Sequence, residues 1–365
     1  MKIISVVGTR PNFMKLAPVA RELETRPGVE HIIVHTGQHY DADMSDDFFD
    51  ELDIPSPSYE LGVGSGTHTE VTAAVMSRLE PVFAFERPDL VIVYGDVNST
   101  MAAAMAAAQR GIRVAHVEAG LRSRDRTMPE ELNRLVTDHI ADLLLAPSAD
   151  AVANLAAEGI DRDKVHFVGN VMIDSLVRAL PRARGGRDDR GRRFNVDGPY
   201  VVTTLHRPSN VDDPEHLRDL LVSLEELSRE TTVLFSMHPR TKRRLEEMQL
   251  KPNGGGALRV LDPLGYLDML GLVSSASLVI TDSGGLQEET SFLGVPCITV
   301  RPNTERPITC SEGTNELVSP TGAGVLGGAR KVLNRKGPRV RPVIERWDGH
   351  AAERIADVVC DGARF

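Results

Sequence analysis

The stretch LVITDSGGLQEETSFLGVPCITV, residues 278–300, carries the clearest fold signal in the chain. An apolar run, LVITD, is followed by two glycines, a helical segment and a second apolar run, CITV. Short runs that are apolar without alternation are typical of strands buried on both faces. The stretch therefore predicts a β-α-β unit whose two strands lie parallel in one sheet.

The same alternation of apolar run and helical segment extends over the whole chain. Strand-like runs occupy residues 3–8, 31–37, 90–96, 114–120, 143–147, 165–170, 200–206, 232–238, 258–263, 278–282 and 297–300. Alternation of this kind predicts an α/β fold, here two Rossmann-like doubly wound domains facing a central cleft. A length of 365 residues also fits two domains of about 100–200 residues each.

The domain boundaries follow from a break in this pattern. Residues 179–199 are rich in Gly and Arg and lack apolar periodicity, so we expect a solvated linker there. This places one Rossmann-like domain at 1–178 and a second at 200–346. Residues 347–365 have the pattern of a helix with an apolar face, and because no strand follows, this helix must pack on one of the domains.

Composition limits the class of protein. Asp and Glu number 52 against 42 Lys and Arg, and this net charge of −10 argues against nucleic-acid and anionic-membrane partners. The three cysteines lack metal-ligand spacing, and no signal peptide or bilayer-length apolar run is evident. We therefore expect a cytoplasmic protein that holds no metal.

The first strand runs into GTRPNFMKLAPV, residues 8–19, which could bind an anion. A glycine turn before a helix start, with Arg10 in the turn and Lys15 inside the helix, suits a phosphate. Equally, Arg10 could cap a loop and Lys15 could be solvated. The stretch is not GxGxxG, so no dinucleotide cofactor is expected.

Three carboxylates follow strands or begin a helix in the first domain. Asp96 and Glu118 each stand at a strand end, and Glu130 follows Pro129 at a helix start. Paired carboxylates at one rim of a cleft suit general acid/base chemistry. Strand-end acids are also common helix caps, and acids after a proline ordinarily meet the positive end of a helix dipole.

The second domain offers a histidine and an anion cradle. His206 ends a strand, where it could donate to a phosphate, carry a proton or only bond within a loop. Ser283, Gly284 and Gly285 open a helix after a buried strand, which leaves backbone N–H groups pointing outward for a diphosphate. Glu289 lies a turn further on, within reach of ribose hydroxyls, and the loop 301–309 adds Arg306.

Ten motifs in order resemble the non-hydrolysing UDP-N-acetylglucosamine 2-epimerase family. They are GTRPNFMKLAPV, TGQHYD, YGDVNST, HVEAGLRS, MPEELNR, HFVGNVMID, TLHRPSNVD, DPLGYLDM, DSGGLQEET and TERPIT, spread over about residues 1 to 340. The resemblance implies a two-domain GT-B fold, a C-terminal helix that returns to the first domain, a homodimer and no cofactor. It also implies interconversion of UDP-GlcNAc and UDP-ManNAc, by expulsion of UDP to 2-acetamidoglucal and its re-addition.

The resemblance also implies roles for single residues. Asp96, Glu118 and Glu130 would be the acid/base carboxylates, and His206 would help the diphosphate leave. The remaining expected ligand contacts are Arg10, Lys15, the turn from Pro263 to Tyr266 at the uracil, Ser283, Gly284, Gly285, Glu289 and Arg306.

Other activities fit parts of the pattern. The sequence HRPSN at 206–210 departs from the HRREN or HRRES of the allosterically regulated enzymes, which leaves room for a 2-epimerase of a UDP-2,3-diacetamido-uronic acid. A hydrolysing epimerase that releases ManNAc and a GT-B glycosyltransferase are the further alternatives.

Overall fold

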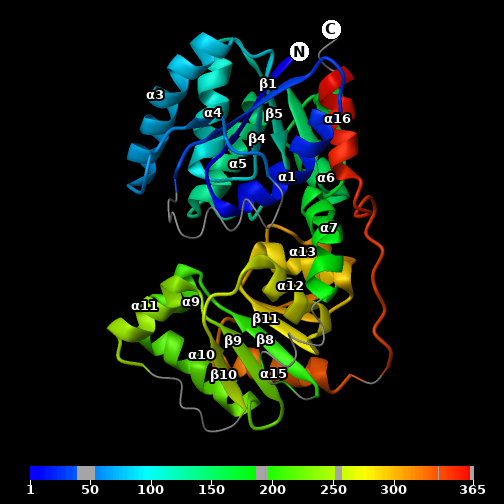
Figure 1. The fold of residues 1–365 in the computed structure, drawn as a ribbon. Helices are drawn as coiled ribbons and strands as arrows, with labels where there is room; N and C mark the ends of the chain where they lie inside the picture. The colour runs from blue at the N-terminus through cyan, green and yellow to red at the C-terminus, as the bar shows by residue number, and fades with distance from the viewer. Residues whose placement is uncertain are drawn as a thin grey trace. The chain divides into compact units, whose positions relative to one another are not determined.

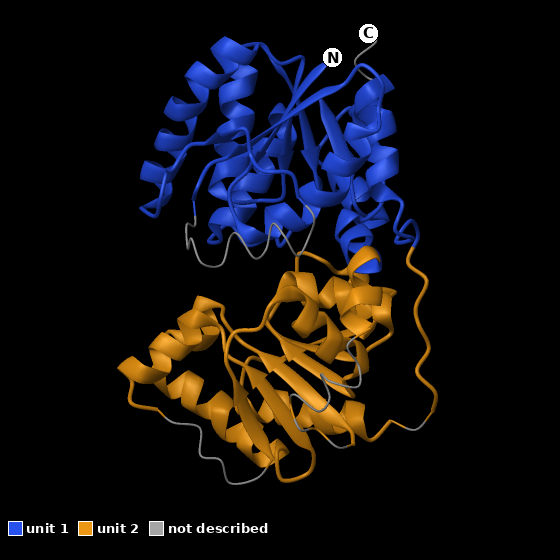
Figure 2. Ribbon diagram, viewed as in Figure 1, with its two compact units in different colours: residues 1–177, 345–365 blue, residues 178–344 orange. Residues whose placement is uncertain are grey.

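The computed structural model describes residues 1–38, 54–185, 194, 196, 198–250, 257–335 and 337–361. The chain divides into two compact units, shown in Figure 2: unit 1 is Met1–Val177 with Glu345–Phe365, and unit 2 is Arg178–Ile344. Each unit holds one parallel sheet with helices on both faces (Figure 1). The predicted α/β fold with two Rossmann-like sheets is confirmed.

The sheet of unit 1 has the order β3-β2-β1-β4-β5-β6-β7 within the described residues. Its strands are β1 (Lys2–Val7), β2 (Glu30–His35), β3 (Tyr59–Glu60), β4 (Leu90–Tyr94), β5 (Arg113–Val117), β6 (Leu143–Ala146) and β7 (Val165–Phe167). From β1 the chain adds β2 and β3 on one side. It then crosses to the other side of β1, where it adds β4, β5, β6 and β7 in order. The topological switch point, where α/β proteins bind ligands, therefore lies between the carboxyl ends of β1 and β4.

Two helical layers cover this sheet. The helices are α1 (Arg10–Glu24), α3 (His68–Glu86), α4 (Asn98–Gln109), α5 (Pro129–Ile140), α6 (Ala149–Ala157), a short 3-10 turn (Arg162–Lys164), α7 (Val171–Gly185) and α16 (Ala351–Asp361). α4 packs between α3 and α5 on one face, while α1 packs against α16 on the other (Figure 1). Five alanines of α4 are buried in one cluster with Val75, Leu79 and the strands, which lets the helices approach closely: Ala102, Ala103, Ala104, Ala106 and Ala107.

The sheet of unit 2 has the order β10-β9-β8-β11-β12-β13, again of described residues. Its strands are β8 (Tyr200–Thr204), β9 (Thr232–Ser236), β10 (Leu258–Leu261), β11 (Leu278–Thr281), β12 (Cys297–Val300) and β13 (Asn315–Val318). Its helices are α9 (Pro208–Val211), α10 (Pro214–Leu227), α11 (Pro239–Glu247), α12 (Tyr266–Ser275), α13 (Gly284–Leu293), α14 (Ile308–Ser311) and α15 (Gly322–Leu333). The switch point lies between β8 and β11.

The stretch 278–300 forms the predicted β-α-β unit. β11 and β12 pair in parallel, with Val279 opposite Cys297, and α13 connects them. Gly294 ends α13 in the left-handed conformation at φ +70°, a position that suits glycine.

Two sequence expectations need correction. Residues 179–185, expected in the linker, form the last turns of α7, because Ala179 and Ala183 bury one helix face at a spacing of four. Residues 186–193, 195 and 197 of the expected linker lie outside the described residues. The C-terminal helix begins at Ala351 rather than at 347, because Gly349 has φ +84° and cannot continue a right-handed helix.

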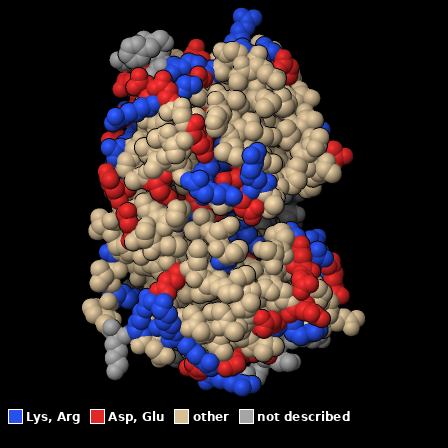
Figure 3. Space-filling view, turned by 180° about the vertical axis from the view of Figure 1, so that it is seen from behind, with Lys and Arg blue, Asp and Glu red and all other residues tan. Residues whose placement is uncertain are grey.

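The surface carries charges of both signs. Figure 3 shows Lys and Arg side chains interspersed with Asp and Glu on the face that it draws. Among the described residues, no helix has the length and apolar character needed to cross a bilayer.

Candidate active site

In unit 1 the expected site residues gather at the carboxyl ends of β1, β4 and β5. Lys15 on α1 and Glu118 after β5 are both buried, and their side chains form an ion pair. The alternative of a solvated Lys15 is therefore wrong. Arg10 is the exposed first residue of α1. A buried ion pair contributes little net stability, so one at a switch point is a candidate functional group.

The backbone at Glu118 is strained. Its φ is +77°, in the left-handed region that non-glycine residues seldom occupy. Such strain costs about 1–3 kcal/mol and persists only where the surrounding structure imposes it, as at many active sites. Close by, Gly95 has no room for a side chain, because a β-carbon there would be 2.7 Å from Lys15 Nζ.

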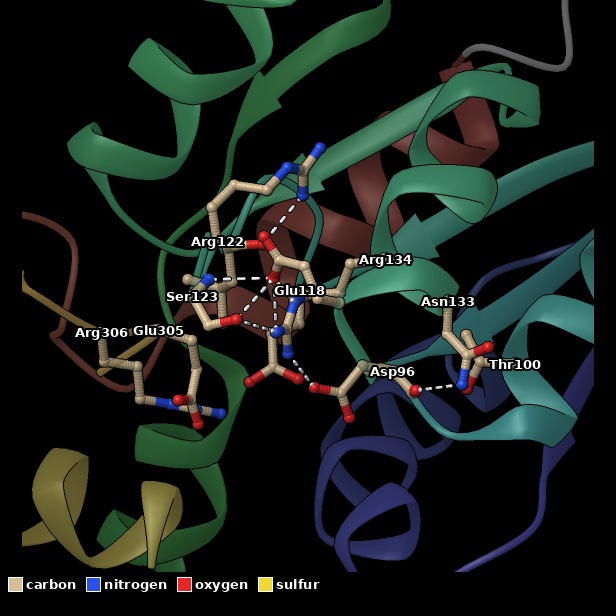
Figure 4. A network of polar contacts seen from close by, with 12 residues as sticks. Asp96, Thr100, Glu118, Arg122, Ser123, Asn133, Arg134, Glu305 and Arg306 are labelled. Atoms are coloured by element: carbon tan, nitrogen blue, oxygen red, sulfur yellow. Dashed lines mark hydrogen bonds and ion pairs between the residues drawn. The ribbon is translucent and has the colours of Figure 1, made fainter. Parts of the chain in front are cut away.

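Asp96 follows β4 and is held by α5 (Figure 4). Its carboxylate forms an ion pair with Arg134, and its carbonyl oxygen accepts a hydrogen bond of 2.9 Å from Asn133 Nδ2. Asp96 does not cap α4, because the N-cap position is Val97 and has no side-chain hydrogen bond. About a quarter of the Asp96 side chain remains exposed, at 27%. Asp96 is thus fixed in position and still accessible.

The structure separates the two acids that begin α5. Glu131 is buried, accepts hydrogen bonds from Ser123 N and Arg124 N at 2.9 Å each, and pairs with Arg134 at 2.6 Å. Burial alone would raise the pKa of Glu131, but Arg134 and these N–H groups lower it below its usual value. Glu131 therefore orders the loop before α5.

Glu130, the acid chosen from the resemblance, faces a pocket instead. This pocket of about 200 Å³ is also lined by His68, Asn98 and Asn133. Its role as an acid/base group stays a prediction.

In unit 2, His206 and Asp282 meet at the switch point between β8 and β11. His206 Nδ1 lies 2.9 Å from Asp282 Oδ1. Asp282 is fully buried and also accepts hydrogen bonds from the backbone N–H groups of His206 and Arg207 and from Asn210 Nδ2, at 2.9–3.1 Å. Burial opposes ionisation, but His206, Asn210 and these N–H groups lower the pKa of Asp282 to about 2.

This contact orients the imidazole of His206. With Nδ1 directed at Asp282, Nε2 is the ring nitrogen that can serve a ligand, and 32% of the side chain is exposed. The ring also stacks at a tilt on His238, with the centroids 5.0 Å apart.

The amino end of α13 has the form expected of an anion cradle. Ser283 is the N-cap residue without a side-chain cap bond, and Gly284 and Gly285 follow. A β-carbon on Gly284 would be 2.6 Å from Arg306 Nη1, so the absence of a side chain admits the arginine. Arg306 pairs with Glu288 at 2.7 Å and with Glu305 at 2.6 Å, which fixes the guanidinium beside the helix end.

The expected uracil and ribose contacts lie in the same unit. Tyr266 begins α12 and is buried, and burial followed by the nearby Glu289 carboxylate raises its pKa well above the usual value. Pro263 is exposed. Tyr266 and Glu289 are thus close in space, although they are 23 positions apart in the sequence.

Two residues that sequence reasoning assigned no role prove central. Arg134 holds Asp96, and Asp282 holds His206. The only sequence signal for either was a charged residue beside a candidate, namely the arginine of MPEELNR and the aspartate that ends the strand before the glycines.

Comparisons with known proteins agree over nearly the whole chain. The family model described as UDP-N-acetylglucosamine 2-epimerase matches residues 21–360. The UDP-N-acetylglucosamine 2-epimerase of Methanocaldococcus jannaschii is 42% identical over 99% of this chain and 100% of its own. A crystal structure of the enzyme from that organism, in complex with UDP-GlcNAc and UDP, gives a TM-score of 0.91 at 42% identity and the same coverage, 99% and 100%. The UDP-2,3-diacetamido-2,3-dideoxy-D-glucuronate 2-epimerase of Pseudomonas aeruginosa is 41% identical over 98% of this chain and 99% of its own.

Proposed function

Because the chain belongs to the UDP-N-acetylglucosamine 2-epimerase family, we propose that it interconverts UDP-GlcNAc and UDP-ManNAc. The observation that carries the proposal is that groups able to transfer protons or bind phosphate gather at the switch points of both sheets. Unit 1 has the Glu118 carboxylate beside Lys15, and unit 2 has a histidine that contacts Asp282, the residue before a glycine-rich helix start.

The reaction demands both kinds of group. The proton at C2 of the sugar is not next to a carbonyl, so direct removal is too costly. Elimination avoids this: the C1–O bond breaks, UDP leaves with the electron pair, and a base takes the C2 proton to give 2-acetamidoglucal. Re-addition of UDP, with a proton delivered to the opposite face of C2, gives the epimer. General acids and bases typically accelerate such steps about 10²–10⁴-fold.

Unit 1 supplies the proton-transfer groups in this proposal. Asp96, Glu118 and Glu130 act on C2, and Lys15 stabilises Glu118 as a carboxylate. Arg134 holds the Asp96 carboxylate in place. Arg10, exposed at the start of α1, is assigned to the nucleotide-sugar.

Unit 2 supplies the groups that hold and release UDP. The N–H groups from Ser283 to Gly285, with Arg306, bind the diphosphate. His206 stabilises the diphosphate as it leaves. Glu289 binds the ribose, and the turn from Pro263 to Tyr266 contacts the uracil.

The proposal extends to the state of the protein in the cell. Following the family resemblance, the chain acts as a cytoplasmic homodimer that binds a UDP-sugar and no nucleic acid. Its molecular mass in solution, measured by light scattering, tests the dimer: a value near 39.8 kDa would contradict it.

One experiment tests the activity. The pure protein is incubated with UDP-GlcNAc in D₂O, and the sugar is followed by NMR. UDP-ManNAc with deuterium at C2 is expected. Free ManNAc would indicate a hydrolysing epimerase, and sugar transfer without C2 exchange a glycosyltransferase. No reaction with UDP-GlcNAc, together with C2 exchange in a UDP-2,3-diacetamido-uronic acid, would move the substrate to that class.

A further inference from the structure

Asp138 on α5 is buried and contacts the end of β5 and two points of the loop that follows it. Its Oδ1 lies 2.6 Å from His116 Nδ1, and its Oδ2 accepts hydrogen bonds from Gly120 N at 3.0 Å and from Arg122 Nη1 at 2.7 Å. His116, Gly120 and Arg122 flank Glu118 on both sides. The single carboxylate of Asp138 thus fixes the loop before and after Glu118.

His116 extends this contact to the turn before Asp96. Its Nε2 lies 2.8 Å from the carbonyl oxygen of Gly95, while Nδ1 faces Asp138. One ring nitrogen of the fully buried imidazole thus faces the carboxylate of Asp138 and the other faces the backbone of Gly95. Burial alone would raise the pKa of Asp138, but His116 and Arg122 lower it, so Asp138 stays ionised. The ring of His116 therefore links Asp138 to the Gly95–Asp96 turn.

Arg122 continues the cluster outward. Its Nε and Nη2 donate to the two carboxylate oxygens of Glu158, at 2.7 Å each. His116, Asp138, Arg122 and Glu158 therefore form one connected cluster behind the loop. None of the four is among the groups assigned to substrate.

The loop needs this support because Glu118 is strained. A non-glycine residue at φ +77° holds that conformation only where neighbouring contacts impose it. Backbone hydrogen bonds from Glu118 N and Ala119 N to Leu145 O fix one side of the loop, at 3.1 and 3.3 Å. Asp138 fixes the other side through Gly120 and Arg122.

We propose that Asp138, acting through His116 and the Gly120–Arg122 backbone, is a positioning residue that holds Glu118 against Lys15 and aligns it with Asp96. The proposal rests on the proposed function for the chemistry of Glu118. Its structural content, that Asp138 orders residues 116–122, stands on the contacts alone.

The test compares Asp138→Asn with Asp174→Asn in the full-length protein. An asparagine offers one acceptor oxygen in place of two and carries no charge, so it cannot accept on both the His116 side and the Gly120–Arg122 side, and Arg122 loses its anionic partner in Asp138. Asp174 is another buried unit 1 aspartate, which accepts from Ala351 N and Ala352 N, not from the loop. It is therefore the matched control for loss of a buried carboxylate.

Asp138→Asn should lower kcat about 10- to 100-fold, with KM and the affinity for UDP within about twofold of the original protein. Asp174→Asn should leave kcat unchanged. In a Glu118→Gln background, Asp138→Asn should change the residual kcat by less than about twofold, because the group it positions is already gone. Additive losses in the double variant, or equal losses in both single variants, would overturn the proposal.

Hydrogen–deuterium exchange separates this inference from the assigned activity. Asp138→Asn should accelerate amide exchange in residues 116–122, and Asp174→Asn should not. If the original protein proves inactive on UDP-sugars, the proposed function fails, and this exchange pattern alone decides the positioning role. Should Asp138→Asn not fold, Glu158→Gln replaces it, because Glu158 lies at the part-exposed outer end of the cluster. Unchanged exchange and kcat in that variant would contradict the proposal.

Discussion

At Gly95, a β-carbon would be 2.7 Å from Lys15 Nζ and 3.2 Å from Glu118 Oε2, and φ is +68°. Gly95→Ala should therefore separate the ion pair and lower kcat at least about 10-fold. It should also cost about 1–2 kcal/mol from the left-handed backbone. Steady-state kinetics and thermal unfolding measure the two effects.

Gly111 provides the matched control for that substitution. It has nearly the same φ, +70°, but no atom lies within 4 Å of its added β-carbon. Gly111→Ala should thus lower stability by a similar amount and leave kcat unchanged. If both variants lost activity equally, backbone strain rather than the ion pair would explain the result.

Asp282 allows a prediction about acid stability. Its folded pKa of about 2 lies below the ordinary value of 3.8. The carboxylate therefore stabilises the fold above about pH 4, and this contribution, about 2 kcal/mol, is lost as the pH falls towards 2. The difference in thermal midpoint between the original protein and Asp282→Asn should be large at pH 5 and shrink by pH 2.5. A difference independent of pH would show that the carboxylate's charge does not matter.

At the scale of elements, Asp174 controls how α16 is attached. Its carboxylate accepts hydrogen bonds from Ala351 N at 3.2 Å and Ala352 N at 2.8 Å at the start of the helix. Burial nevertheless raises the pKa of Asp174 to about 6. The folded state thus favours the protonated form. Protonated Asp174 therefore adds about 3 kcal/mol to the free energy of unfolding below about pH 4. This contribution is lost as the pH rises from 4 through 6.

The predicted result is a pH-dependent attachment of α16. Amide exchange in residues 351–361 should be faster at pH 7.5 than at pH 4.5, after correction for the intrinsic rate. Asp174→Asn should remove most of that difference. An exchange difference that survives in Asp174→Asn would assign it to another group.

Elements were more predictable than their ends and edges. Apolar runs predict buried strands, and each run named from the sequence overlaps a strand of the structure. The edge strands β3 and β13 were missed, because β3 has two residues and β13 reads NELV, of which only the last two residues are apolar. The last turns of α7 were missed because only Ala179 and Ala183 pack there, and the neighbouring arginines make the segment read as a polar linker.

The candidate site was predictable only where a motif is local. The start of α13, with Ser283 and Gly284, can be read from consecutive residues. The partners that fix the chemistry cannot, because they come from distant segments: Arg134 lies 38 positions from Asp96, and Asp282 lies 76 positions from His206. Such pairs depend on the register of separate strands and helices, which no single motif encodes.

At the scale of the whole molecule, the net charge of −10 contrasts with an anionic substrate. The cations that would meet UDP are local and supported by acids: Arg306 lies between Glu288 and Glu305. Lys15 of unit 1 is paired with an acid too, but it lies at the proton-transfer groups, beside Glu118. This arrangement implies that affinity for UDP and turnover depend on different units and can be lost separately.

A thermal-shift experiment tests that separation. UDP at 100 times its dissociation constant should stabilise the original protein by about 2.7 kcal/mol. Asp96→Asn should show the same shift with UDP but lose turnover, since Asp96 belongs to unit 1.

Gly284→Ala should lose most of the shift. A β-carbon on residue 284 would lie only 2.6 Å from Arg306 Nη1, so the guanidinium would have to move away from the helix start. Gly327→Ala, on α15 with no atom within 4 Å of the added carbon, should behave like the original protein. A normal UDP shift in Gly284→Ala would remove the α13 start from the diphosphate site, and a lost shift in Asp96→Asn would show that the two functions cannot be separated.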